Sequence, residues 1–289
     1  VAGASFAVAL PLASRWYPPE LQGIALGIAG AGNSGVVFAA LFAPGLAAAF
    51  GWTNVLGLAT IPLIIAFVTY LLVARESPEK PPPKSFAEYM AVFRIGDAWW
   101  FMFFYAVTFG GFVGLASSLT IYFSDQYGLS PVLAGYFTAA CVFAGSLMRP
   151  VGGALADRVG GIRALSIMYT VAAAAIAIVS IGLPQAWMAL LAFVIGMLAL
   201  GMGNGSVFQL VPQRFRIEMG VMTGLIGMTG GIGGFYLASS LGYSKQLTGS
   251  YSVGLLLFAA LAAVALLGLT SVKTRWRTTW GAVAGLGRI

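Results

Sequence analysis

The 289-residue chain has no histidine, one cysteine and few charged side chains. Without histidine it lacks the commonest general base, metal ligand and proton relay. The single cysteine, Cys141, excludes a disulfide within the chain and a cysteine–histidine metal cluster. Charged residues make up 8% of the chain, whereas soluble domains carry about 25%. These absences exclude an ordinary soluble domain and argue against an enzyme or a bound cofactor.

Hydrophobic residues make up 60% of the chain, and they are gathered in long runs. Runs of about 20 apolar residues suit membrane-spanning helices. The chain contains nine such runs, so we predict an all-α polytopic membrane protein with spans at residues 1–15, 22–49, 52–74, 97–123, 131–156, 162–182, 186–211, 218–241 and 249–271.

One long polar stretch, residues 75–96, divides the runs into three and six. Its Pro81-Pro82-Pro83 sequence favours an extended segment. The predicted organisation is a partial bundle over 1–74, a linker over 75–96, a six-helix bundle over 97–271 and a tail over 272–289.

The basic residues predict the orientation of the spans. They gather in alternate loops, whereas the opposite loops hold only Lys245. By the positive-inside rule the basic loops, the linker and the C-terminal tail are cytoplasmic. Because they are scattered in small groups, the net charge of +7 does not indicate a nucleic-acid partner.

An internal repeat indicates how many helices the whole fold contains. The sequence from Gly3 to Phe6 resembles Gly205 to Phe208, and a glycine-rich run follows each copy. The copies match the first and second helices before the linker, 1–15 and 22–49, to the fourth and fifth after it, 186–211 and 218–241. We therefore expect two six-helix halves, a known transporter plan, with three further helices upstream of Val1.

Arg149 is the only charged side chain that we place inside a predicted span. A lone arginine in hydrocarbon costs roughly 2.5–3.5 kcal/mol on insertion scales. No carboxylate in another span is available to pair with it. Either Arg149 snorkels to the interface or an anion visits it, and we favour the anion because Arg158 and Arg163 already serve the interface.

A charged loop follows the span of Arg149. The sequence Gly153-Ala154-Leu155-Ala156-Asp157-Arg158-Val159-Gly160-Gly161 resembles the loop motif G-x-L-a-D-r-x-G of the major facilitator superfamily. Asp157 can face the positive N-terminus of a neighbouring helix. We predict that Gly153, Asp157 and Arg158 form a conformational latch; the alternative is an ordinary charged loop.

Residues 30–35, Gly-Ala-Gly-Asn-Ser-Gly, match the dinucleotide pattern G-x-G-x-x-G, but no strand precedes them and they lie in an apolar span. Glycines in such spans let helices approach closely. Asn33 is predicted to bind the ligand or line its pathway, because a buried amide needs partners. For Asn204, lining the pathway and bonding another helix remain equal alternatives.

The aromatic residues of the spans are more often core than ligand when judged by periodicity alone. Tyr105 carries a hydroxyl that can bond an anion. Phe6 and Phe208 lie on repeat-related helices and can sandwich a flat ligand.

Together these sequences resemble the nitrate/nitrite porters of the major facilitator superfamily, the NarK/NasA type. The resemblance is carried by residues 27–35 with Ala43-Pro44 and Gly51-Trp52, by residues 203–208 with Pro212 to Phe215, and by the run 223–235. It covers essentially the whole chain, which looks like helices 4–12 of a twelve-helix fold.

The resemblance implies that two arginines hold the anion between the halves, with Arg149 as the one on helix eight. Its partner belongs to helix two, which this chain does not include. The substrate-binding residues implied are Arg149, Tyr105, Asn33, Phe6, Phe208, Ser206, Gly227 and Gly230. No metal or other cofactor is implied.

We therefore predict a secondary transporter of nitrate or nitrite in a bacterial inner membrane, working as a monomer. All eight acids lie in loops or at helix ends, which favours nitrate/nitrite exchange over proton-coupled uptake. The alternatives are a carrier of another small anion or organic acid, and a membrane nitrate sensor.

Overall fold

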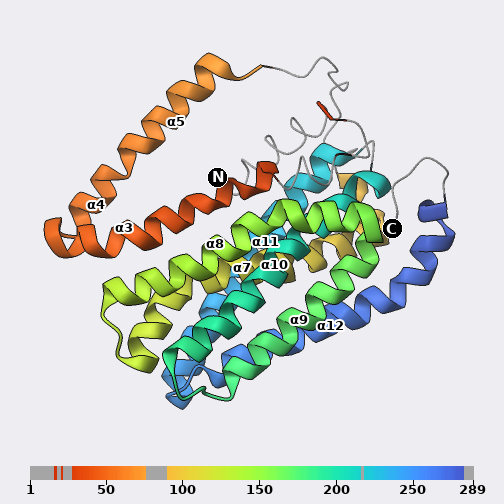
Figure 1. Cartoon of the computed structure of the whole chain (residues 1–289). Helices are drawn as coiled ribbons and strands as arrows, with labels where there is room; N and C mark the ends of the chain where they lie inside the picture. Colours follow the sequence, from red (N-terminus) through yellow and green to blue (C-terminus); the bar gives the residue numbers. More distant parts are fainter. Residues whose placement is uncertain (1–15, 18–20, 22–27, 76–89, 216–217, 283–289) are drawn as a thin grey trace.

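The computed structural model describes the chain except residues 1–15, 18–20, 22–27, 76–89, 216–217 and 283–289. The described part is helical, which confirms the all-α fold (Figure 1). Its elements are η3 (Ala31–Ser34), α3 (Gly35–Phe50), α4 (Trp52–Leu58), α5 (Thr60–Val73), η4 (Val92–Arg94), α7 (Gly96–Tyr127), α8 (Pro131–Val159), α9 (Gly161–Ser180), α10 (Ala186–Arg214), α11 (Met219–Thr248), α12 (Ser252–Thr278) and η5 (Trp280–Ala282).

Eight helices or helix pairs within the described residues are long and apolar enough to cross a membrane. They correspond to eight of the nine predicted spans, and the remaining one, 1–15, lies outside the described residues. Most helices extend beyond the predicted limits; α12, for example, continues to Thr278. Because most of the polar stretch is not described, the division at 75–96 stays a prediction.

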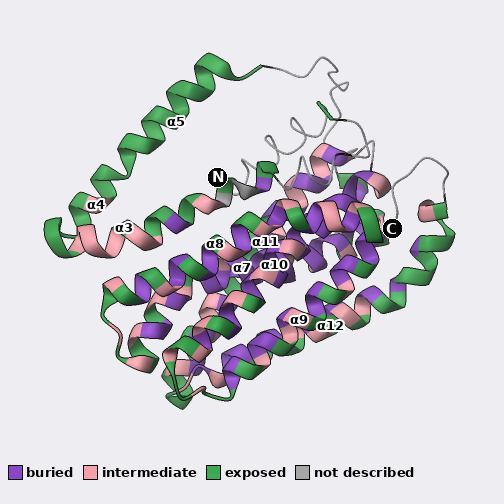
Figure 2. Cartoon of the chain, viewed as in Figure 1, coloured by how far each residue is buried: buried purple, intermediate pink, exposed green. Residues whose placement is uncertain are grey.

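Helices α7 to α12 form one bundle, in which α8 packs on α10, α7 on α11, and α9 on both α10 and α12. Glycines make the closest of these contacts possible. A β-carbon on Gly201 would lie 1.9 Å from the Gly145 carbonyl oxygen, and one on Gly233 would lie 2.1 Å from that of Ala106. Buried residues fill the space between these helices (Figure 2). Small residues therefore act here as packing surfaces, as they commonly do between membrane helices.

Helix α3 lies along α8 on the side of the bundle, and η3 continues the contact. The two helices touch where a β-carbon on Gly135 would lie 2.6 Å from the Ala40 carbonyl oxygen. Helices α4 and α5 contain no buried residue and extend away from the bundle (Figure 1). Their apolar side chains suit a hydrocarbon surface.

The start of α7 meets the ends of α10 and α12 at one carboxylate. Asp97 accepts a hydrogen bond of 2.8 Å from Arg214 Nε and another of 2.8 Å from the Trp276 indole nitrogen. Arg275 also pairs with it. Phe101 stacks on Trp276 with ring centres 4.8 Å apart. This cluster places three helix ends, two of them basic, on the same face of the bundle.

Candidate functional site

Arg149 lies in the middle of α8 and only 1% of its surface is exposed. Its Nη1 donates a hydrogen bond of 2.7 Å to the Gly30 carbonyl oxygen, and its Nη2 donates one of 2.9 Å to the Tyr105 hydroxyl. Both acceptors are neutral. Within the described residues no carboxylate binds Arg149, so its positive charge is buried without a counter-ion. The side chain is directed into the protein and does not snorkel.

Aromatic rings surround the guanidinium on the α7 side. Tyr105 and Phe109 are one helical turn apart and stack with their ring centres separated by 5.0 Å. Arg149 Cζ lies 5.3 Å from the centre of the Phe109 ring, a cation–π distance. Phe208 of α10 meets Tyr105 edge to face at 4.9 Å. The arrangement is a buried, flat-walled site with one fixed positive charge.

Glycines leave room for these side chains. A β-carbon on Gly30 would lie 3.1 Å from Arg149 Cζ, and one on Gly230 would lie 2.6 Å from the Phe109 ring. Gly227 is buried one turn earlier on α11. A larger residue at Gly230 would displace the rings, and one at Gly30 would crowd the guanidinium, so both positions favour glycine.

The structure therefore brings together four of the predicted site residues: Arg149, Tyr105, Phe208 and Gly230. It adds two that were not predicted, Phe109 and the Gly30 carbonyl. The position of Phe109 four residues after Tyr105 would have placed it on the same helix face. The carbonyl left no signal in the sequence, because its role depends on how α8 meets Gly30, the residue just before η3.

The remaining predicted residues are placed differently. Ser206 donates to the Met202 carbonyl oxygen at 3.1 Å and to that of Gly152 at 3.4 Å, so its hydroxyl serves the contact between α8 and α10. Asn33 belongs to η3, but the structure does not describe its side chain. Phe6 lies outside the described residues. Asn204 is fully buried, and neither atom of its amide has a hydrogen-bond partner among the described residues.

The predicted latch residues lie at the turn between α8 and α9. Gly160, with φ of 98°, permits the chain to reverse in a single residue. The Asp157 carboxylate is hydrogen-bonded by the Gln209 side chain of α10. Gly153 is buried against Gly205, and Arg158 is exposed. Asp157 thus joins two helices of the same bundle, and a latch between conformations stays a prediction.

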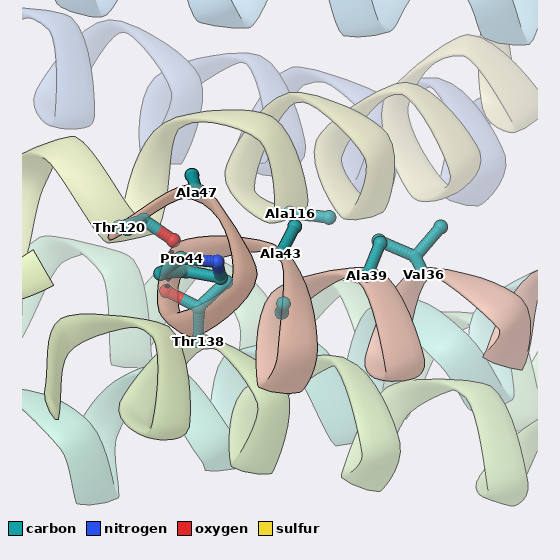
Figure 3. A pocket seen from close by; sticks show the side chains of 9 residues that line it. Val36, Ala39, Ala43, Pro44, Ala47, Ala116, Thr120 and Thr138 are labelled. Carbon is teal, nitrogen blue, oxygen red and sulfur yellow. Dashed lines mark hydrogen bonds between the residues drawn. The ribbon is translucent and has the colours of Figure 1, made fainter. Parts of the chain in front are cut away.

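A hollow of about 390 Å³ lies away from Arg149, between α3 and the bundle (Figure 3). Its lining is apolar apart from Thr120 and Thr138. Thr120 donates to Thr138 at 2.9 Å, and Thr138 donates to the Ala134 carbonyl oxygen. Both hydroxyl protons are therefore used, and this hollow offers an anion neither a charge nor an available donor.

Comparison with known proteins supports the same architecture. Residues 1–238 match the sequence profile of the Major Facilitator Superfamily. The fold is also similar to the crystal structure of the E. coli fucose:proton symporter, with a TM-score of 0.70 and 18% identity over 92% of this chain and 72% of that one.

Curated relatives with similar sequences cover 92% of the chain. They include the nitrite extrusion protein of Bacillus subtilis at 32% identity and a probable nitrate/nitrite transporter of Mycobacterium tuberculosis at 34%. A probable nitrate/nitrite antiporter of Thermus thermophilus is 29% identical. The chain spans 66%, 68% and 67% of the length of these three relatives, respectively.

Proposed function

The chain belongs to the major facilitator superfamily, within its group of nitrate/nitrite transporters, and on this basis we propose that the whole protein carries nitrate and nitrite across the membrane. The observation that carries the proposal is the buried Arg149, which has neutral acceptors and aromatic rings around it. A planar guanidinium can bind two oxygens of a planar anion at once. Nitrate and nitrite have this shape and carry the single negative charge that the site lacks.

The size of the site supports a small anion over a larger organic acid. Gly30 packs on Arg149 and Gly230 packs on the Tyr105–Phe109 stack, each so closely that one added carbon atom would be in tight contact. A bulky substrate would have to separate these groups widely, whereas a flat anion of three or four atoms needs much less room. This is the specific reason to prefer nitrate and nitrite.

We further propose that transport is an exchange of nitrate for nitrite. The acids in the described helices lie at helix ends, and Asp97 and Asp125 are already hydrogen-bonded there. None lies beside Arg149 to carry a proton. An empty carrier would have to reorient with an unneutralised charge in its core, whereas a loaded carrier is neutral at this position. Binding of either anion therefore favours the reorientation step.

The orientation follows from the positive-inside rule. The Asp97 cluster places the ends of α10 and α12 on one face, together with Arg214 and Arg275. Basic residues gather on the cytoplasmic side of membrane proteins. We propose that this face and the C-terminus are cytoplasmic and that the protein resides in the plasma membrane of a bacterium.

The test is a counterflow assay with the full-length carrier in liposomes. Nitrite loaded inside should accelerate uptake of labelled nitrate without any pH gradient, and a larger carboxylate outside should not compete. Uptake that depends strictly on a pH gradient, with no acceleration by nitrite, would contradict exchange. Absence of nitrate uptake under every condition, with uptake of the carboxylate, would refute the substrate assignment.

A further inference from the structure

Ser146 has a buried hydroxyl that no other group of the described structure satisfies. Seven serine and threonine residues are classed as buried in the described chain, and six of them have a hydrogen bond to a backbone carbonyl oxygen: Thr108, Thr138, Ser180, Ser206, Thr223 and Ser244. Ser146 has none, although its exposed fraction is 0%. A buried polar group without a partner destabilises the folded protein, so an isolated hydroxyl of this kind calls for a ligand.

The position of Ser146 on α8 is set by helix geometry. It follows Gly135 by eleven residues, which is close to three turns of a helix, so the two residues share a face. Gly135 contacts α3 at Ala40 and Pro44. Ser146 therefore faces the helix of the first half of the chain and not the lipid.

Ser146 also lies about one helical turn before Arg149 on α8. Arg149 comes three residues later on the same face of α8, and long helical side chains lean toward the N-terminus of their own helix. The Arg149 side chain thus extends over the turn that carries Ser146. On the opposite side, Gly30 receives the Arg149 hydrogen bond and η3, which contains Asn33, packs on α8. The free hydroxyl faces the junction where an anion on Arg149 would lie.

We propose that Ser146 is a specificity-determining residue whose hydroxyl donates a hydrogen bond to the third oxygen of a trigonal oxyanion. This inference rests on the proposed function. The guanidinium fork accounts for two oxygens of the anion. Nitrate has a third oxygen that still needs a donor, whereas nitrite has none. Ser146 therefore stabilises bound nitrate more than bound nitrite and sets the ratio of the two affinities.

The test compares nitrate and nitrite binding to the full-length protein by calorimetric titration. Ser146→Ala removes the donor, and Ser146→Cys keeps the volume with a much weaker donor. Loss of one hydrogen bond to a charged ligand raises the nitrate Kd about tenfold in both variants, whereas the nitrite Kd changes by less than about twofold. Ser180→Ala is the matched control, because its buried hydroxyl bonds only to the Ala177 carbonyl oxygen, and it should bind both anions as the native protein does.

Four other outcomes are informative. Equal loss of nitrate and nitrite in the Ser146 variants would overturn the discrimination, and so would unchanged binding of both. Weaker nitrate binding by Ser146→Ala but not by Ser146→Cys would also overturn it, because volume and not hydrogen bonding would then matter. If the native protein binds neither anion, the proposed function fails instead, independently of Ser146.

Discussion

Replacing Arg149 by lysine separates the effect of charge from the effect of geometry at the site. Lysine retains the positive charge but presents a compact ammonium instead of a planar fork. In the native protein two guanidinium nitrogens are held at 2.7 Å from Gly30 O and 2.9 Å from the Tyr105 hydroxyl, which fixes the plane of the group. An ammonium cannot reproduce both contacts and also pair with two oxygens of a flat anion. At least one charge-assisted hydrogen bond is lost, worth about 1.5–3 kcal/mol.

This loss corresponds to a nitrate affinity about 10- to 150-fold weaker in Arg149→Lys. The measurement is calorimetric titration of the purified full-length protein with nitrate, with thermal unfolding to check that the variant is folded. Arg277→Lys is the control, because Arg277 is exposed near the end of α12 and should bind nitrate normally. If the folded lysine variant binds nitrate within twofold of the native protein, the fork is not what recognises the anion, and the geometric argument is refuted.

Three further substitutions test the surroundings of the site and of the bundle. Tyr105→Phe removes the acceptor of one Arg149 hydrogen bond but keeps the ring, so nitrate should bind about tenfold more weakly with little change in Tm. Gly30→Ala places a methyl group 3.1 Å from the guanidinium and should reduce nitrate uptake at least about tenfold. Gly32→Ala is the control, because its methyl group meets nothing within 4 Å, and it should leave uptake unchanged. Equal uptake by the two variants would contradict the close packing of Gly30 on Arg149. Asp97→Asn leaves Arg214 and Arg275 without their counter-ion and should lower the stability, seen as a lower Tm. Because the cluster is partly exposed and screened by solvent, the loss should be only about 2 kcal/mol. An unchanged Tm would mean that the cluster contributes nothing to stability.

The fold could be predicted from the sequence because long apolar runs are a strong signal for membrane helices. A membrane helix must satisfy its own backbone hydrogen bonds, so a long apolar run has one folded outcome. The predicted ends of the helices were less accurate. The helix over 97–123, for example, continues to Tyr127 as α7, and α11 continues past 241 to Thr248. Polar residues at the membrane interface end the apolar run while the helix continues, so the run understates the length of the helix.

The site could be predicted from the sequence only in part, because its residues come from distant segments of the chain. Arg149 stood out by its charge in a span, and Tyr105, Phe208 and Gly230 through the family resemblance. The structure places these four around one point. Phe109 was missed because a phenylalanine in an apolar helix looks like packing. Ser206 was assigned to the substrate from its sequence motif, yet its hydroxyl bonds to backbone carbonyls between α8 and α10.

The scarcity of charge in this sequence has a direct consequence at Arg149. A carboxylate beside the guanidinium would have cancelled its charge and occupied the two oxygen positions that an anion needs. Here the arginine is held instead by the carbonyl of Gly30 and the hydroxyl of Tyr105, which orient it without neutralising it. Gly30 is suited to this role because its backbone can approach the guanidinium where a β-carbon would crowd it. The low charge of the spans and the glycine on the opposing helix therefore serve the same end: they keep an oriented positive charge available for a small anion.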